Sequence, residues 1–166
     1  MSELKRGVAV CPGTYDPVTN GHLDIIGRAA KIFDRLVVGV VDVQVRKQPP
    51  MFDAAQRKAF IAEAVSGLEN VEVETFSGLL VEFARDNGAT AIVKGLRAIS
   101  DFEFEFEMNQ LNRKLAPEIE SAYVMASPEY SFLSSTGVKE LATFGGDVGD
   151  LVPAEVAAAL RERIER

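Results

Sequence analysis

The sequence predicts an α/β fold: a doubly wound sheet of about five parallel strands with helices on both faces. Short apolar runs alternate about five times with longer segments whose apolar residues recur at helical spacing. Residues 36–41 (LVVGVV) show none of the polar alternation of a half-exposed strand, which is typical of a parallel strand covered on both faces. A chain of 166 residues suits one domain, so we expect residues 1–166 to form a single domain.

The predicted elements follow one another in the order that this fold requires. Residues 7–11 (GVAVC) predict a buried strand, and residues 22–33 predict a helix because their apolar residues are three or four apart. Asp53 with Gln56 three residues later is a capping-box pattern, so a helix begins there and ends before Gly67. The other expected elements are strands at 36–41, 71–75, 91–94 and 119–126, and helices at 79–87, 100–115, 138–144 and, after Pro153 as the first helical residue, 154–166.

One segment carries conflicting signals. Residues 101–108 (DFEFEFEM) alternate strictly between polar and apolar, which by period alone indicates a strand. We predict a helix instead, because Ser100 and Glu103 form a capping pattern and Pro117 ends a run of helix-forming residues. That helix would have two apolar faces, which fits either contact with a neighbouring subunit or complete burial.

Composition excludes several classes of protein. Hydrophobic residues make up 47% of the chain and charged residues 26%, which excludes a disordered or fibrous protein. No apolar run is long enough to span a membrane and residues 1–11 contain no secretion signal, so we expect a soluble cytoplasmic protein. A net charge of −7 argues against a nucleic-acid partner. One cysteine and one histidine exclude a disulfide framework and a multi-cysteine metal site and argue against a structural zinc site, so we predict no metal-ligating residue.

The turn after the first predicted strand is the first candidate for a functional site. Residues 12–20 (PGTYDPVTN) follow that strand and lead into a helix, whose first N–H groups and positive dipole end favour anions. Gly13 and Gly21 would let the backbone approach phosphate oxygens closely. His22 could donate a hydrogen bond to a phosphoryl oxygen, although a lone histidine at a helix start is often a cap or a surface residue. Neither a P-loop nor a G-x-G-x-x-G fingerprint is present.

Two pairs of cations follow other strands. Lys94 and Arg97 bracket a glycine directly after the fourth predicted strand, where they could clamp phosphates, Arg97 in bidentate fashion. A solvated pair leaving the sheet is equally consistent with this pattern. Arg46 and Lys47 lie in the loop after the second strand, where cations usually face solvent.

Hydroxyl groups open the helix after the fifth predicted strand. Ser134, Ser135 and Thr136 exceed the single hydroxyl that an N-cap needs, which favours a second anion site. Glu105 could meet a ribose hydroxyl or a cation, although an exposed helical glutamate is the more frequent case. The carboxyl ends of parallel strands meet at one edge of a sheet, so these loops should converge there. Such a site stabilises and orients phosphates, which suits transfer of a nucleotidyl or phosphoryl group. Cys11 is predicted to be buried rather than reactive.

Three motifs in order along the chain resemble those of a known family. Residues 12–22 (PGTYDPVTNGH) resemble the opening motif of the nucleotidyltransferase superfamily with a [T/H]-x-G-H signature. Residues 94–105 (KGLRAISDFEFE) and 130–140 (YSFLSSTGVKE) resemble the two later motifs of bacterial phosphopantetheine adenylyltransferases. The resemblance implies a Rossmann-like nucleotidyltransferase domain that transfers the adenylyl group of ATP to 4′-phosphopantetheine, giving 3′-dephospho-coenzyme A and pyrophosphate. It also implies Mg²⁺ as cofactor and a homohexamer that is a dimer of trimers.

The same resemblance implies roles for individual residues. His22 matches the family's transition-state-stabilising histidine, and His22, Lys47 and Arg97 make up the implied catalytic set. The residues implied to contact the nucleotide are Thr14, Tyr15, His22, Gly95, Leu96, Arg97, Glu105, Tyr130, Ser131, Phe132, Leu133, Ser134, Ser135 and Thr136. The residues implied to contact the acceptor are Thr14, Lys47, Leu80 and Lys94.

The loop after the second strand departs from the family pattern, in which a small polar residue and a proline precede a catalytic lysine. Here residues 42–47 read DVQVRK, so Arg46 takes the lysine's position without a gap and Lys47 takes it after a one-residue insertion. We prefer Lys47, because a compact ammonium on a flexible stem suits a moving phosphate better than a planar guanidinium. Two alternatives stay open: an adenylyl- or cytidylyltransferase of the same fold with another acceptor, and a non-catalytic nucleotide or coenzyme A sensor.

Overall fold

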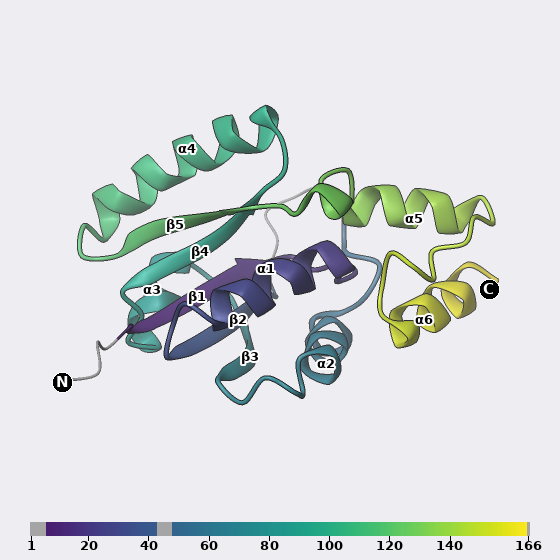
Figure 1. Cartoon of the computed structure of the whole chain (residues 1–166), viewed down its shortest axis with the longest axis horizontal. Coiled ribbons are helices and arrows are strands. Elements are labelled where there is room, and N and C mark those ends of the chain that lie inside the picture. The colour runs from purple at the N-terminus through teal and green to yellow at the C-terminus, as the bar shows by residue number, and fades with distance from the viewer. Residues whose placement is uncertain (1–5, 43–47, 166) are drawn as a thin grey trace.

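The computed structural model describes residues 6–42 and 48–165, which form a five-stranded parallel sheet in the order β3-β2-β1-β4-β5 (Figure 1). Strands and helices alternate along most of the chain, and the order reverses between β1 and β4. This arrangement confirms the predicted doubly wound α/β fold. The elements are β1 (Val8–Gly13), α1 (Asn20–Ala30), β2 (Arg35–Val41), α2 (Ala54–Ala64), β3 (Val71–Phe76), α3 (Leu80–Asp86), β4 (Ala91–Leu96), α4 (Ile99–Leu115), β5 (Glu120–Met125), the 3₁₀ turn η1 (Pro128–Tyr130), α5 (Ser135–Thr143) and α6 (Ala154–Ile164).

The core has two layers, one on each face of the sheet. In β2, Leu36, Val38 and Val40 pack with residues of α1 and α2, whereas Val37 packs with α3 on the opposite face. All four side chains are fully buried. Burial on both faces explains why this run is apolar throughout, as the sequence indicated.

Two strands extend further than predicted. β1 continues through Pro12 and Gly13, and β4 continues through Gly95 and Leu96, so these residues lie in strands rather than in the predicted loops. Pairing with a neighbour decides both cases, because Pro12 and Gly13 stay in register with β2, and Gly95 and Leu96 with β5. Tertiary pairing therefore overrides the turn preference of proline and glycine.

The segment with conflicting signals is helical, as predicted, since residues 101–108 lie within α4. The predicted cap is wrong: the N-cap is Ala98, which makes no side-chain capping hydrogen bond, rather than Ser100. Complete burial is also wrong for this chain by itself, because α4 contains no buried residue. Phe102 and Phe106 stack with ring centroids 6.0 Å apart and remain 53% and 54% exposed.

The structure also tests several local predictions about helix ends and about Cys11. The capping box of α2 is confirmed, since Asp53 accepts from the Gln56 N–H and Gln56 accepts from the Asp53 N–H. Pro153 is the N-cap of α6 rather than its first residue. Cys11 is a free, buried cysteine, as expected. Over the described ranges, no helix combines the length and the apolar character needed to cross a membrane.

Candidate active site

Two neighbouring strands diverge at the carboxyl edge of the sheet. β1 pairs with β2 from Val8 to Gly13, but it pairs with β4 only at Ala9 and Val10. Beyond Val10 the strands separate at the point where the strand order reverses, which is where open α/β sheets bind ligands. A cavity of about 490 Å³ lies there, within the size range of small-molecule sites.

The cavity brings together most of the residues that the sequence proposed. Those that line it are Tyr15, His22, Gly95, Arg97, Glu105, Tyr130, Leu133, Ser134, Ser135 and Thr136. They come from the loop after β1, from α1, from the end of β4, from α4 and from the start of α5. The predicted convergence at one edge is therefore confirmed for the loops after β1, β4 and β5, whereas Arg46 and Lys47 after β2 lie outside the described residues.

His22 is held by the local structure of the helix start. Helix α1 begins two residues earlier than predicted, so His22 is its third residue and Thr19 is its N-cap. The His22 ring accepts the Thr19 backbone N–H at Nδ1, 3.0 Å away, and Thr19 Oγ1 accepts the His22 backbone N–H at 3.3 Å. A backbone N–H only donates, so Nδ1 is the acceptor and the neutral ring carries its proton on Nε2.

The charge of His22 follows from its surroundings. Burial disfavours the imidazolium, and the nearby Arg97 guanidinium adds repulsion, so the pKa of His22 falls from its ordinary value near 6.5 to about 4. At neutral pH the ring is therefore an uncharged donor through Nε2–H. Such a donor stabilises negative charge that develops on a phosphoryl oxygen.

Nuclear magnetic resonance can test this charge state directly, because the chain contains a single histidine. We expect the ring Cε1–H resonance to keep its neutral position from pH 8 down to about pH 5.5 and to titrate with a midpoint near pH 4. Since the folded pKa lies below the unfolded one, the folded state resists protonation and loses stability as pH falls from about 6.5 towards 4. In urea the same resonance should titrate near its ordinary value, and a midpoint near 6.5 in the folded protein would contradict the neutral state of this half-buried ring.

Tyr15 packs against the His22 ring. Its ring packs edge-on against His22 with centroids 5.1 Å apart, and its hydroxyl donates to the Cys11 carbonyl at 2.9 Å. Tyr15 has φ of 51°, the left-handed region that costs a non-glycine residue about 1–2 kcal/mol. A Cβ on Gly13 would lie 2.9 Å from the Tyr15 ring. Gly13 therefore makes room for this ring, whereas the sequence had suggested room for a phosphate.

Arg97 lies at the end of β4 and is fixed by three contacts. Its Nε donates to Asp101 at 3.1 Å, its Nη2 donates to the same carboxylate at 3.3 Å, and its Nη1 donates to the Leu133 carbonyl at 2.8 Å. Arg97 and Asp101 both line the cavity. The guanidinium thus adds positive charge to the site while it holds residue 133 against β4.

The start of α5 forms another wall of the cavity. Ser134 is the N-cap, and its Oγ accepts the Gly137 N–H at 3.0 Å. Ser135 Oγ donates to the Pro17 carbonyl at 2.7 Å, so both serine hydroxyls are engaged in holding the wall. The N–H groups of the first helical turn and the positive end of the helix dipole remain as the anion-binding feature here.

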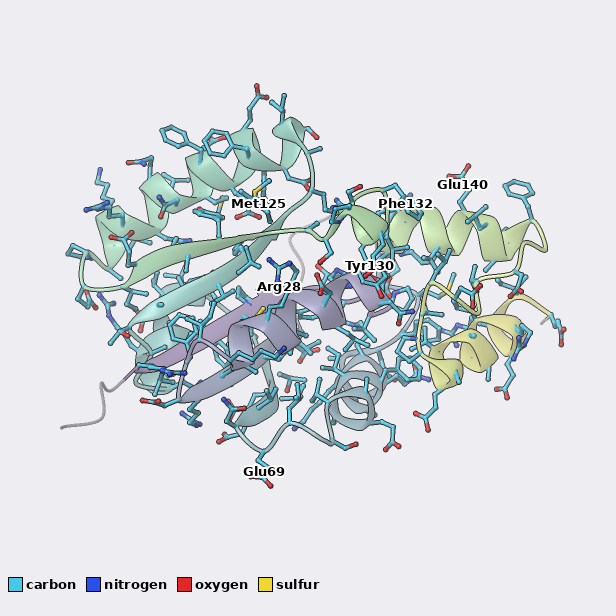
Figure 2. All side chains as sticks on the ribbon, viewed as in Figure 1. Arg28, Glu69, Met125, Tyr130, Phe132 and Glu140 are labelled. Atoms are coloured by element: carbon cyan, nitrogen blue, oxygen red, sulfur yellow. The ribbon has the colours of Figure 1, made fainter. Side chains whose placement is uncertain are left out.

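Arg28 links α1 to the end of β5 and to the segment that leads into η1. Its guanidinium lies between α1 and β5, as Figure 2 shows, and donates to the Met125 carbonyl at 2.8 Å and to Ser127 Oγ at 3.4 Å. Ser127 Oγ in turn donates to Asp24 at 2.7 Å. These contacts fix the end of β5 just before η1 and the cavity-lining residue Tyr130.

Lys94 and Glu105 are paired with each other. Lys94 Nζ lies 2.9 Å from Glu105 Oε2, and their side chains are 20% and 17% exposed. Glu105 lines the cavity and Lys94 does not. The sequence had assigned these residues separately to the nucleotide and to the acceptor, and the structure makes them neighbours.

Several proposed residues lie away from the cavity. Thr14, Leu80, Lys94, Leu96, Ser131 and Phe132 do not line it. Leu80 packs with the core layer on the α3 face, and Phe132 is 73% exposed. Lys47, proposed as catalytic, and its alternative Arg46 lie outside the described residues.

Several residues that build the site received no individual role from the sequence. Asp101 lines the cavity and lies four residues after Arg97, a spacing that could have indicated the pair. Thr19 precedes His22 by three residues, which is the spacing of a capping box. Asp16, Arg57 and Lys139 also support the site. Asp16 and Lys139 lie within the motifs at 12–22 and 130–140, but no local spacing indicates their contact partners.

Comparisons with known proteins identify the family. Residues 10–141 match the model of the cytidylyltransferase-like family. The phosphopantetheine adenylyltransferase of Rubrobacter xylanophilus is 52% identical over 159 residues, which are 96% of each chain. That of Thermodesulfovibrio yellowstonii is 52% identical over 157 residues, covering 95% of this chain and 97% of the relative.

Solved structures share the fold at much lower identity. Two structures of a bifunctional NMN adenylyltransferase/ADP ribose pyrophosphatase from Francisella tularensis, one of them complexed with AMP and a manganese ion, match with TM-scores of 0.68 and 0.70 at 15% identity. The match covers 96% of this chain and about half of theirs (49% and 50%). Half-identical relatives matched over nearly their whole length, together with this sheet and cavity, show that the chain belongs to the phosphopantetheine adenylyltransferases, within the cytidylyltransferase-like family.

Proposed function

We propose that this protein is a nucleotidyltransferase that transfers the adenylyl group of ATP to 4′-phosphopantetheine. An oxygen of the acceptor phosphate attacks the α-phosphorus of ATP, the bond from that phosphorus to the β-phosphate oxygen breaks, and pyrophosphate leaves with the electron pair. The products are 3′-dephospho-coenzyme A and pyrophosphate. The relatives' common activity supports this reaction.

One observation carries the proposal for the site. A neutral His22, the Arg97 guanidinium and the first turn of α5 face a single cavity at the carboxyl edge of the sheet. Each of these groups favours negative charge on phosphate oxygens, and the His22 ring offers no free lone pair for nucleophilic attack, because Nδ1 accepts the Thr19 N–H. They suit a direct in-line transfer, in which the protein contributes position and charge stabilisation rather than a covalent intermediate.

The remaining site assignments belong to this proposal. The proposed surroundings of ATP also include Thr14, Tyr15, Gly95, Leu96, Glu105 and the residues from Tyr130 to Thr136. Thr14, Lys47, Leu80 and Lys94 are the proposed contacts of the acceptor. Because Lys94 is already paired with Glu105, an acceptor phosphate that binds Lys94 would have to share or displace this ion pair.

We propose that Mg²⁺ reaches the site on the phosphates of ATP. Two carboxylates line the cavity, and each is paired with a cation: Asp101 with Arg97 and Glu105 with Lys94. Among the described residues, no group of three or more histidine, cysteine, aspartate or glutamate side chains could hold a metal ion. These donors fit an ion that keeps its own waters and phosphate ligands, as Mg²⁺ does in many nucleotide sites, where it offsets phosphate charge.

We also propose a single nucleotidyltransferase domain that works in the cytoplasm as a homohexamer, a dimer of trimers. The two apolar faces of α4 support an assembly, because Phe102 and Phe106 on one face, and Phe104, Leu111 and Leu115 on the other, are each more than half exposed. The stacked rings of Phe102 and Phe106 form an exposed apolar patch of the kind that marks interaction sites. The formal net charge of −7 supports small-molecule partners rather than nucleic acid.

The decisive experiment measures pyrophosphate release from purified protein with ATP and Mg²⁺, with and without 4′-phosphopantetheine. We expect release only when the acceptor and the metal are both present, and loss of release after chelation by EDTA. Nicotinamide mononucleotide and glycerol phosphate serve as control acceptors. Release with one of these in place of 4′-phosphopantetheine would overturn the proposed substrate, and ATP binding without any release would indicate a sensor.

A further inference from the structure

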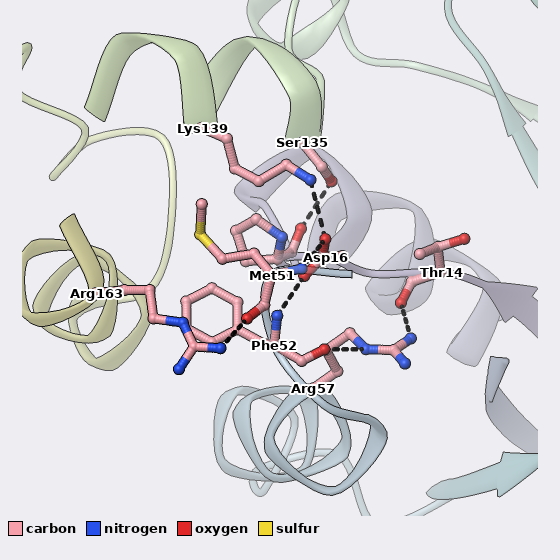
Figure 3. Close-up of polar contacts among 9 residues, drawn as sticks. Thr14, Asp16, Met51, Phe52, Arg57, Ser135, Lys139 and Arg163 are labelled. Carbon is pink, nitrogen blue, oxygen red and sulfur yellow. Dashed lines mark hydrogen bonds and ion pairs between the residues drawn. The ribbon is translucent and has the colours of Figure 1, made fainter. Parts of the chain in front are cut away.

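A buried carboxylate lies behind the cavity and does not line it. Asp16, which is 4% exposed, accepts the backbone N–H groups of Met51 at 2.8 Å and Phe52 at 2.9 Å, and it accepts from Lys139 Nζ at 2.9 Å (Figure 3). Asp16 belongs to the turn between β1 and α1, Met51 and Phe52 precede α2, and Lys139 lies on α5. One carboxylate therefore joins three segments that are distant in the sequence.

α5 is attached to the same turn at a second point. Ser135 Oγ donates to the Pro17 carbonyl at 2.7 Å (Figure 3). Lys139 follows Ser135 by four residues, so both side chains leave the same face of the helix. Ser135 lines the cavity on one side, and Gly13 and Tyr15 line it beside the turn. The two contacts behind the cavity thus fix two of its walls relative to each other.

Arg57 holds the turn independently of Asp16. Its guanidinium donates to the carbonyls of Thr14 at 2.7 Å, Val41 at 2.9 Å and Phe52 at 2.9 Å. Loss of the Asp16 charge therefore leaves the turn and residue 52 connected through Arg57. In α5 the contact that depends on Asp16 is the one from Lys139, and without it the helix is joined to the turn through Ser135 alone of these two contacts.

We propose that Asp16 and Lys139 are a positioning pair for the active site, which holds the first turn of α5 in register with the β1–α1 turn. The inference rests on the adenylyl transfer proposed above, because both walls must meet the reacting phosphates together. A buried ion pair is weak evidence for stability, since desolvation of two charges offsets their attraction. Alignment is far more sensitive, because a displacement of about 1 Å can lower a rate by about 10²-fold.

Asp16→Asn tests the pair while it preserves the size of the side chain. The new amide group would direct a donor at the Lys139 ammonium or at a backbone N–H. We expect kcat to fall by about 10²-fold, while KM for ATP changes by less than about threefold, because ground-state contacts tolerate a small shift better than in-line attack does.

Lys139→Met tests the same contact from the other side. The Lys139 side chain is 28% exposed, and the Asp16 carboxylate that it leaves keeps the backbone N–H groups of Met51 and Phe52 as donors. We expect kcat to fall on the order of tenfold. The double variant should lose no more than Asp16→Asn alone, since both substitutions remove one contact, whereas additive losses would overturn the pairing.

Asp34→Asn is the matched control. The Asp34 carboxylate also accepts two backbone N–H groups, those of Arg6 at 2.9 Å and Gly7 at 3.2 Å, but it lies at the opposite edge of the sheet. We expect wild-type kcat in this variant. A fall as large as that of Asp16→Asn would overturn the positioning role, and so would wild-type kcat in Lys139→Met, which decides the matter if the Asp16 variant does not fold.

Amide hydrogen exchange separates this inference from the proposed reaction. Without substrate, Asp16→Asn and Lys139→Met should both exchange faster at the first turn of α5 and at wild-type rates around β3, and Asp16→Asn should also exchange faster at Met51 and Phe52. Unchanged exchange at α5 would overturn the pair whatever the reaction. If the wild-type protein released no pyrophosphate but the variants showed this exchange pattern, the adenylyl transfer would be wrong and the link between the two walls would be supported.

Discussion

His22→Ala lowers kcat for adenylyl transfer by about 10²–10³-fold, the usual cost of removing one preorganised donor to developing charge. The Nε2–H group is neutral at working pH because burial and Arg97 lower the pKa of the ring to about 4. Since this donor acts most strongly in the transition state, KM for ATP should change much less than kcat. Steady-state pyrophosphate release at saturating acceptor gives both constants.

His22→Gln is the companion variant for this measurement. Glutamine offers a neutral N–H donor from a different position, so we expect it to recover part of the activity that alanine loses. Thermal unfolding of both variants controls for the lost capping contact with Thr19, which should cost about 0.5–2 kcal/mol. A folded alanine variant with kcat within a few-fold of wild type would remove His22 from the mechanism.

Arg57→Met lowers the free energy of unfolding by at least about 3 kcal/mol. Arg57 is 1% exposed, and its guanidinium satisfies the carbonyls of Thr14, Val41 and Phe52. Methionine fills most of the space but donates no hydrogen bond, and each buried carbonyl that loses its donor costs about 1–3 kcal/mol. Urea unfolding followed by circular dichroism measures the loss.

Arg35→Met is the matched surface control. Arg35 also makes charged hydrogen bonds, to both oxygens of Glu72 at 2.8 and 2.7 Å, but its side chain is 36% exposed. Exposed ion pairs contribute about 0–1 kcal/mol, so this variant should stay close to wild type. If the two substitutions cost the same, burial would not be what makes Arg57 important.

Local patterns predicted the parts of the fold that depend on nearest neighbours. The apolar run at 36–41 became the doubly covered strand β2, and the Asp53–Gln56 spacing became a capping box. The strand ends were less predictable. Pro12 and Gly95 carry turn preferences, but pairing with β2 and β5 keeps them in strands.

The candidate site was likewise predictable in its location but not in its detailed contacts. The motifs around His22, Arg97 and Ser134 could be assigned to one edge of the sheet, because parallel strands bring their carboxyl ends together. Their detailed roles could not. Ser135 and Gly13 were expected to face phosphate, and the structure shows the Ser135 hydroxyl bound to Pro17 and the space beside Gly13 filled by Tyr15.

The sequence by itself determined the order of strands and helices along the chain, the loops that would meet at one edge and the family to which the chain is similar. The first two depend on local residue spacing, and the third depends on short motifs. Only the tertiary structure decided the charge of His22, since that depends on burial and on the field of Arg97. It also decided the partners of Asp16, because Lys139 lies 123 residues away and no local pattern links two side chains at that separation. Contacts across such distances follow from how the layers pack, which becomes defined only once the whole chain has folded.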